Sequence, residues 1–224
     1  MVSTQIAVAF HGIGQPGRDL EPGEARYWIS QDQFLSFLDL VAVSPDPARI
    51  VLTFDDGNAS DYEIALPAMR ERGLTGSFFP IAGRLDRPGS LGTAQLDDLA
   101  AAGMTVGSHG IAHVDWRKLD DQALEAELVG SKQILESRIG RPVTTASLPF
   151  GRYDARVLSA LRRAGYGVVF STDGGPSHPG EALVSRSNLR VEMTRNDFVN
   201  LVCGQDTLMG RFKRHLKALR RRFT

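Results

Sequence analysis

Two neighbouring carboxylates directly follow a strand-like run in the first third of the sequence. Residues 51–54 favour a β-strand, and Asp55, Asp56 and Gly57 come immediately after them. Because side chains alternate along a strand, the two carboxylates can point in different directions, one toward a metal ion and the other toward a reacting water. Gly57 allows a sharp backbone turn. A turn that only ends a strand uses the same residue types, so both interpretations stay open for this stretch alone.

Two histidines, His109 and His113, follow another strand-like segment and lie four residues apart. On one turn of a helix, this spacing places both imidazoles on the same side, within reach of a single ion. Asp56 would add a third ligand and leave open positions for water and substrate. This ligand set suits Zn²⁺, our first choice, and also Co²⁺ or Ni²⁺. The three residues together therefore predict a divalent metal site.

The elements that must position these side chains alternate between strand-like and helix-like patterns. Strand-like segments cover residues 6–10, 50–54, 76–81, 104–106, 142–146 and 166–170, with 183–185 or 188–191 as a seventh. Helical spacing covers residues 33–43, 61–72 (interrupted by Pro67), 93–102, 120–139, 154–164 and 197–202. Residues 15–30 are predicted to form a long surface loop. The alternation indicates parallel βαβ units, and about seven of them favour a (β/α)7 barrel in a single domain.

In such barrels the active site lies at the C-terminal ends of the strands. Several polar or aromatic residues follow the predicted strands directly, and we expect them to meet at this edge. They are His11, Asp55, Asp56, His109, Phe150, Asp173 and Arg186.

Composition limits the class of protein. A chain of 224 residues with 42% hydrophobic and 23% charged residues is ordinary for a globular domain. The single cysteine, Cys203, excludes an internal disulfide framework and a cysteine-rich zinc site. No apolar run is long enough to span a membrane, and the first residues lack the pattern of a secretion signal. We therefore expect a cytoplasmic protein, without a nucleic-acid partner.

Together the motifs resemble the polysaccharide deacetylase family, the NodB-homology carbohydrate esterases. The most specific are TFDDG at 53–57 and SHGIAH at 108–113. LPFGRYD at 148–154 resembles the third motif of a branch that deacetylates exopolysaccharides, and TDGG at 172–175 and HGIG at 11–14 fit that branch too. The similarity spans roughly residues 6–191.

The resemblance implies a distorted (β/α)7 barrel that removes N-acetyl groups from a sugar polymer with a divalent metal. It implies Asp55 as the general base. The implied metal ligands are Asp56, His109 and His113. Phe150, which follows the donorless Pro149, would offer its backbone N–H to the acetyl oxygen, where negative charge develops.

The chain departs from the family pattern around the base and the histidine loop. Gly110 stands where the family usually has a hydroxyl residue, and Ser147 stands where it usually has an arginine that pairs with the base. Arg186 or Arg152 can supply that cation from elsewhere. We favour Arg186, because it follows a predicted strand.

The terminal histidine motif that would identify the general acid is also missing. An amine leaves poorly unless it is protonated, and histidine is a natural donor near neutral pH. The candidates are His178, in the loop after the sixth strand, and His11, at the end of the first. We prefer His178, because a loop can close over a polymer, with Asp173 or Arg186 tuning the site.

Two further residues have both a functional and an ordinary interpretation. Trp116 can stack on a sugar ring or be a half-buried aromatic residue. Asp173 can orient a catalytic side chain or simply form a turn. The expected substrate contacts are therefore Trp116, Asp173, Pro149 and Phe150.

The leading function is a metal-dependent N-deacetylase that acts on a GlcNAc-type polysaccharide or oligosaccharide. One alternative is a hydrolase of small non-sugar amides. The other is a catalytically silent glycan-binding barrel, which the missing arginine and terminal histidine would explain.

The C-terminal residues 207–224 form a separate region after a barrel over residues 1–206. The net charge is zero, but this region holds seven Lys or Arg and no acid, which leaves 19 basic and 26 acidic residues before it. Its apolar residues recur at the spacing of an amphipathic helix: Leu208, Phe212, Leu216, Leu219 and Phe223. Such a helix can pack on the barrel, or bind an anionic membrane surface or a partner in polysaccharide assembly.

Overall fold

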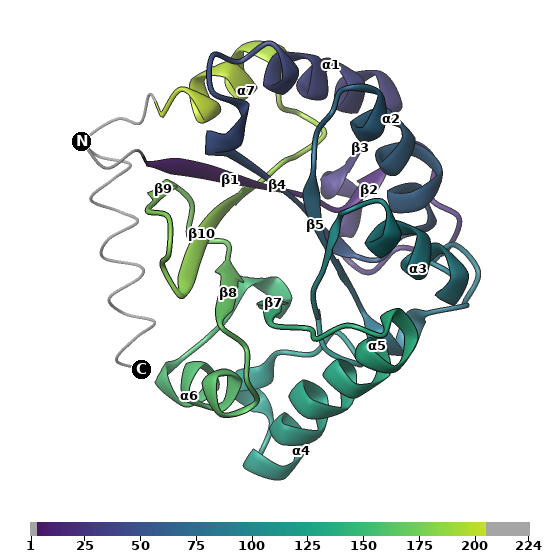
Figure 1. The fold of residues 1–224 in the computed structure, drawn as a ribbon, viewed down its shortest axis with the longest axis vertical. Coiled ribbons are helices and arrows are strands. Elements are labelled where there is room, and N and C mark those ends of the chain that lie inside the picture. The colour runs from purple at the N-terminus through teal and green to yellow at the C-terminus, as the bar shows by residue number, and fades with distance from the viewer. Residues whose placement is uncertain (1–3, 205–224) are drawn as a thin grey trace.

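The computed structural model of the protein describes residues 4–204, and the predicted helix over residues 207–224 lies outside this range. Seven parallel strands form the sheet, in the order β6-β5-β4-β1-β10-β8-β7 (Figure 1). In chain order these are β1 (Gln5–Phe10), β4 (Ile50–Asp56), β5 (Gly76–Pro80), β6 (Thr105–Val106), β7 (Thr145–Ser147), β8 (Val168–Ser171) and β10 (Leu183–Asn188). The seven strands predicted from the sequence are therefore confirmed.

The sheet curls into a nearly closed barrel. Its two outer strands, β6 and β7, meet only just beyond β6, where Ser108 forms a parallel bridge with Ala146. The backbone N–H of Ser108 donates to Thr145 at 3.0 Å, and that of Ser147 donates to Ser108 at 2.8 Å. This arrangement confirms the distorted (β/α)7 barrel.

Helices cover the outside of the barrel (Figure 1). They are α1 (Gln31–Ala42), α2 (Leu66–Glu71), α3 (Thr93–Ala101), α4 (Asp121–Glu125), α5 (Ser131–Ile139), α6 (Ala155–Arg163) and α7 (Arg195–Val202). Their starts follow the expected chemistry, since the side chains of Ser30, Asp120, Asp154 and Thr194 each accept a backbone N–H of the first turn. Among the described residues, no helix is both long and apolar enough to cross a membrane.

Two of the predicted helices are interrupted by π-helical turns. The first contains the turn Asp61–Ala65, after which α2 begins. Pro67 therefore follows the π-helical turn directly, at the second position of α2, and the turn is the irregularity that the sequence indicates here. The second predicted helix contains the turn Ala126–Gly130, between α4 and α5.

Apolar side chains pack on both sides of the strands. Between sheet and helices, Phe54 stacks on Phe10 at 5.1 Å and on Phe78 at 4.4 Å between ring centroids. A smaller buried cluster of Ala7, Phe79, Phe170 and Val184 packs apart from this main core. Because side chains alternate along β4, Phe54 points to the helix side and Asp55 to the opposite side, inside the barrel.

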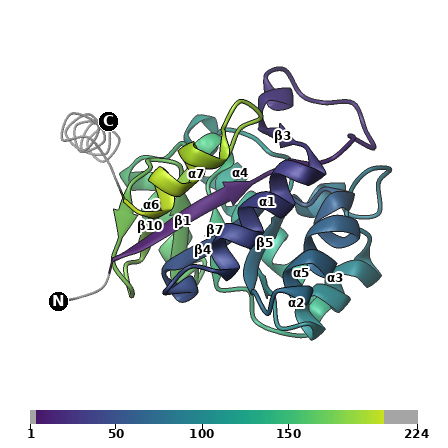
Figure 2. The ribbon, with the colours of Figure 1, turned by 90° about the horizontal axis from the view of Figure 1, so that it is seen from above.

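Residues 14–30 contain the surface loop that the sequence predicts at 15–30, but short strands hold this segment in place. The short strands β2 (Gly12–Ile13) and β3 (Trp28–Ile29) pair in parallel and hold the two ends of the segment together. The Trp28 ring is buried against Gly12, where an added Cβ would lie 2.1 Å from a ring atom. Figure 2 shows the segment beyond the C-terminal end of β1, so it is placed to cover that edge of the barrel.

Candidate active site

Asp56, His109 and His113 come together at the C-terminal edge of the barrel, where each can offer a ligand atom within 4.8 Å of the others. Asp56 ends β4, and the histidines lie on the loop that follows β6. The predicted helical turn for the histidine pair is wrong. The loop is irregular, with positive φ angles of 80° at Gly110 and 51° at His113. The loop, rather than helical spacing, brings the two imidazoles to one point.

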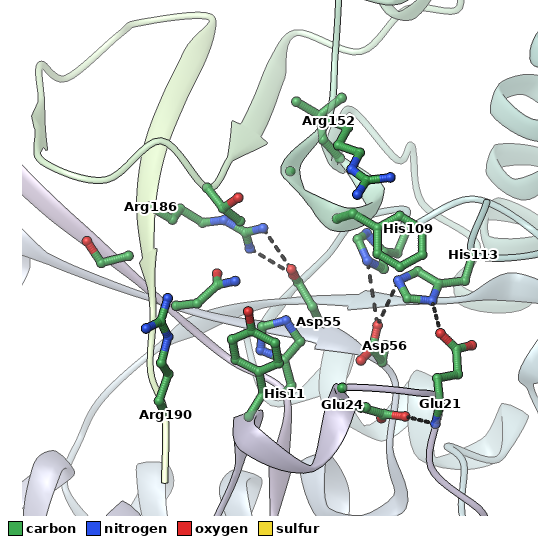
Figure 3. A pocket seen from close by; sticks show the side chains of 18 of the residues that line it. His11, Glu21, Glu24, Asp55, Asp56, His109, His113, Arg152, Arg186 and Arg190 are labelled. Carbon is green, nitrogen blue, oxygen red and sulfur yellow. Dashed lines mark hydrogen bonds and ion pairs between the residues drawn. The ribbon is translucent and has the colours of Figure 1, made fainter. Parts of the chain in front are cut away.

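The hydrogen bonds of the two histidines leave one nitrogen of each ring free for an ion. His109 Nδ1 lies 2.9 Å from the Ser147 carbonyl oxygen, and His113 Nδ1 lies 3.0 Å from a Glu21 carboxylate oxygen (Figure 3). Both oxygens can only accept, so each Nδ1 carries the proton and each Nε2 has a free lone pair. The two Nε2 atoms lie 3.6 and 3.7 Å from Asp56 Oδ1.

These three atoms fit a cation. Asp56 Oδ1 is buried and has no hydrogen-bond partner among the described residues. A buried carboxylate oxygen facing two lone pairs is costly unless something positive lies between them. Burial also lowers the pKa of His109 to about 4, so its imidazole is neutral near pH 7, as metal binding requires.

Glu127, which the sequence analysis missed, holds the histidine loop. Its carboxylate accepts the backbone N–H groups of Ile111 at 2.7 Å and Ala112 at 3.3 Å. A Cβ at Gly110 would lie 2.6 Å from this carboxylate, and the φ of Gly110 is positive. The glycine that departs from the family pattern is therefore required here, and Glu127 steadies the loop in place of a hydroxyl.

Asp55 lies beside the triad and is paired with Arg186. The two guanidinium NH groups of Arg186 donate to the two carboxylate oxygens of Asp55, both at 2.7 Å. Ser147 Oγ accepts from Arg186 at 2.6 Å and donates to Asp55 at 3.0 Å. Burial alone would raise the pKa of Asp55, but the Arg186 guanidinium holds it well below its usual range.

Arg186 thus provides the cation expected from either Arg186 or Arg152. It reaches the base across the barrel and covers the position where Ser147 replaces the usual arginine. Arg152 instead pairs with Asp115 at 3.2 Å.

A cavity of about 590 Å³ opens over this group, a size typical of small-ligand sites. His11 lines it, with its ring stacked on Tyr27 at 4.9 Å and its buried Nδ1 without a partner among the described residues. The Phe150 ring is 48% exposed and packs at 4.4 Å on His113. Asp173 lines the wall and accepts hydrogen bonds from Tyr153 at 2.7 Å and Ser171 at 2.9 Å.

Three predicted site residues lie elsewhere. His178 is exposed and follows β9 (Pro176–Ser177), which runs antiparallel to the first residues of β1. It is therefore at the opposite end of the barrel from Asp55, and our preference for it as the acid is wrong. Trp116 is buried and packs behind Gly110, so it cannot stack on a sugar. Pro149 is buried and does not line the cavity.

The segment 14–30 also supplies residues that line the cavity. Glu21, Pro22, Gly23, Glu24 and Tyr27 all line the cavity. Arg18 fixes this segment, because it pairs with the Glu24 carboxylate and donates to Asn58 Oδ1 at 2.9 Å. Arg190, which follows β10, lines the cavity on the side of His11 (Figure 3).

Comparisons with known proteins agree with this geometry. Residues 42–169, more than half of the chain, match the sequence model of the polysaccharide deacetylase family. YxkH of Bacillus subtilis (strain 168), a protein of polysaccharide deacetylase type, is 26% identical over 172 residues, which cover 77% of this chain and 58% of that protein. The chitooligosaccharide deacetylase of Rhizobium leguminosarum bv. trifolii is 27% identical over 134 residues, covering 59% of this chain and 60% of the relative. The chain thus spans about three-fifths of the length of both.

Among solved structures, the deacetylase PplD of Streptococcus pyogenes, in complex with acetate, has the same fold. It superposes with a TM-score of 0.77 at 20% identity, over 90% of this chain and 99% of that one.

Proposed function

The chain belongs to the polysaccharide deacetylase family, and on that premise we propose that it is a metal-dependent hydrolase that removes N-acetyl groups from a GlcNAc-type polysaccharide or oligosaccharide. One observation carries the proposal. The candidate ligand atoms of Asp56, His109 and His113 converge beside a second carboxylate, Asp55, which Arg186 keeps charged. A metal site beside a charged carboxylate that can accept a proton suits hydrolysis of an amide.

Asp56, His109 and His113 would hold the ion, with Zn²⁺ as the proposed metal and Co²⁺ or Ni²⁺ as alternatives. When bound, such an ion supplies Lewis acidity, which polarises an amide carbonyl and makes water easier to deprotonate. The hydrogen bonds to Ser147 and Glu21 keep both histidines in the tautomer that such binding needs.

Asp55 is the proposed general base. Because Arg186 lowers its pKa, Asp55 stays a carboxylate over the whole neutral range and can accept a proton from the attacking water. Ser147 and Arg186 together fix the direction in which its oxygens point.

His11 is now the proposed general acid. It directly follows β1 and lines the same cavity as Asp55 and Asp56 (Figure 3). Its ring position is fixed by the stacking on Tyr27. From this place it would give a proton to the nitrogen of the departing amine, and the position of His178 beside the first residues of β1 supports His11 over His178.

The backbone N–H of Phe150 is the proposed donor to the acetyl oxygen. Phe150 adopts a φ of 57°, which is uncommon for a residue other than glycine. Such strained backbone is concentrated at functional sites, where neighbouring structure holds it in place. The exposed Phe150 ring beside His113 offers an apolar surface for the acetyl group or the sugar.

Two observations support an active enzyme over a catalytically silent glycan-binding barrel. That alternative rested on a missing arginine and a missing histidine. Arg186 contacts the base, and His11 lines the cavity. The other alternative, a hydrolase of small amides, differs from a glycan deacetylase in its substrates, so an activity screen distinguishes the two.

The test is an activity screen with the Zn²⁺-loaded protein over chitooligosaccharides and small amides, with mass spectrometry to detect the loss of each acetyl group. We expect acetate release from the oligosaccharides and none from the small amides. Two controls separate the roles. Asp55→Asn should keep the metal and lose turnover, and His113→Ala should lose both. Metal-loaded protein that binds the glycan but releases no acetate would contradict the proposal.

We also propose that the basic residues 207–224, which lie outside the described range, bind an anionic membrane surface or a partner in polysaccharide assembly. The support is the pattern of seven basic residues around an apolar stripe. A glycan polymer built at a membrane would make such a contact useful.

A further inference from the structure

We propose that Glu21 is a positioning residue for the metal centre, and that it couples metal binding to closure of residues 14–30 over the site. The inference rests on the proposed function in one respect, because it requires that Asp56, His109 and His113 bind an ion. Glu21 belongs to none of the motifs that the sequence analysis singled out.

The contact that carries the proposal joins Glu21 to His113. A carboxylate oxygen of Glu21 lies 3.0 Å from His113 Nδ1, while Nε2 of the same ring faces Asp56. A carboxylate that accepts the second N–H of a metal-binding histidine fixes the orientation of the ring and makes its other nitrogen a better ligand. The His113 side chain is only 11% exposed, whereas that of Glu21 is 38% exposed, so a partly exposed carboxylate holds a largely buried ring.

The two histidines differ in what holds them. His109 donates to the carbonyl oxygen of Ser147, which belongs to β7 and to the frame of the barrel. His113 lies on irregular backbone with a φ of 51°, and its acceptor is a side chain 92 residues away in the sequence. The orientation of one proposed ligand therefore depends on the segment 14–30, and that of the other does not.

Arg84 ties Glu21 to the loop that carries the histidines. Its guanidinium pairs with the carboxylate oxygen of Glu21 that does not face His113. Arg84 ends a short 3-10 turn (Ala82–Arg84), and this turn is bonded to the histidine loop from Ala82 N–H to Gly110 at 2.9 Å. Three separate stretches of chain thus meet at one carboxylate.

This junction makes metal binding and closure mutually dependent. If closure of residues 14–30 strengthens metal binding through Glu21, then metal must favour closure by the same factor. Closure also matters for substrate, since Glu24 and Tyr27 of this segment line the cavity. Another anchor of the segment, from Arg18 to Glu24 and Asn58, does not touch either histidine. Glu24 also accepts the backbone N–H of Glu21 at 2.8 Å, so it helps to position that residue.

The first experiment measures the Zn²⁺ affinity of the metal-stripped protein by competition with a chelator. Glu21→Ala should bind about 10–100-fold more weakly than wild type, the usual cost of losing such an outer partner. Asp19→Asn, at an exposed position of the same segment that does not line the cavity, should stay within about threefold. Glu21→Gln should fall between them, because its amide oxygen still accepts from Nδ1 but carries no charge. Thermal unfolding of the metal-free variants serves to detect a general loss of structure.

The second experiment follows cleavage by trypsin after Arg26, a half-exposed residue of the segment. Zn²⁺ should slow this cleavage in wild type and in Asp19→Asn, but not in Glu21→Ala. Unchanged Zn²⁺ affinity in Glu21→Ala would overturn the role of Glu21 alone. Equal losses in Glu21→Ala and Asp19→Asn would also overturn it, by showing that the loss of any negative charge in the segment has the same effect. Wild-type protein that binds no Zn²⁺ would instead overturn the metal centre of the proposed function.

Discussion

Arg186 and Asp55 form a buried ion pair that joins residues 131 positions apart in the sequence. Both contacts are 2.7 Å, and the two side chains are 0% and 2% exposed. The guanidinium also lies 5.6 Å from the ring centroids of Phe79 and Phe170, so it is packed as well as paired. A cation held in this way acts on the base continuously, whether or not substrate is present.

Arg186→Gln should shift the pH dependence of catalysis. The pKa of Asp55 is depressed by Arg186, so without the guanidinium burial dominates and that pKa rises. The base is then protonated at higher pH, and the acidic limb of kcat/KM against pH should move upward. Arg186→Lys keeps a charge and should shift the limb less. Arg152→Gln, which removes the other candidate cation, should leave the limb in place. If the acidic limb does not shift in Arg186→Gln, Arg186 is not the residue that lowers the pKa of Asp55.

The same substitution should lower stability. Breaking a buried ion pair costs about 3–5 kcal/mol, because one charge is left without a partner. The sign with pH follows from the depressed pKa of Asp55. The pair stabilises the fold above the pKa of Asp55 in the unfolded chain, and this contribution is lost as the pH falls through the folded value. Urea unfolding of wild type and Arg186→Gln near neutral pH should show the difference.

His11→Ala should reduce turnover by about 10²–10⁴-fold if His11 is the general acid, with metal content unchanged. His178→Ala should stay within about threefold of wild type, because His178 lies beside the start of β1 rather than in the cavity. Single-turnover rates and metal analysis on the same preparations test both. Near-wild-type rates in both variants would mean that the proton comes from another group.

Strand-end residues were the part of the site that could be predicted from the sequence. Parallel strands bring their C-terminal ends to one edge, so Asp55, Asp56, His109 and Arg186 could be grouped without coordinates. The same rule favours Arg186 over Arg152, because Arg186 follows a predicted strand. The barrel itself followed from the alternation of strand and helix patterns.

The same rule failed for His178, because the chain reverses direction after β8. Residues 172–175 leave the strand at the cavity edge, but β9 then runs back antiparallel to β1. A two-residue strand that contains Pro176 gives no detectable pattern in the sequence. Position in the chain after a strand was therefore mistaken for position in space.

Glu21 and Glu127 could not be identified for a different reason. Each is a single acidic residue in a region rich in charge, and each acts through a contact with a distant loop. Nothing in local spacing distinguishes such a carboxylate from a solvated one. Only the fold, which brings residue 21 to residue 113, shows that it has a partner.

Because of residues 207–224, the full chain should sediment together with anionic vesicles. Each basic residue near an anionic surface contributes about 1 kcal/mol, so binding should weaken as salt is added. A chain that ends at Gln205 should stay in the supernatant, and neutral vesicles should bind neither protein. Equal sedimentation of the two proteins with anionic vesicles would contradict a membrane role for this region.

Asp61 is a buried acid without a hydrogen-bond partner for either carboxylate oxygen among the described residues. It begins the π-helical turn that follows the site. Burial raises its pKa well above the ordinary value, and the charges of Asp56 and Asp55 raise it further. The folded protein therefore keeps the Asp61 proton at a pH where the unfolded chain has released it.

Asp61→Asn should therefore stabilise the metal-free protein increasingly as the pH rises. Wild-type stability falls with rising pH, from the pKa of an unfolded aspartate at about 3.9 until the folded Asp61 ionises, by about 1.4 kcal/mol for each unit by which folding raises that pKa. Asparagine has no proton to release, so its advantage in free energy of unfolding should grow as the pH rises through and above the range in which an unfolded aspartate ionises. Urea unfolding of both proteins across this range measures it. Asp97→Asn, at an exposed position of α3, is the matched control. Its free energy of unfolding should differ from that of wild type by the same amount at every pH. Parallel stability curves for wild type and Asp61→Asn would show that Asp61 is ionised in the folded protein.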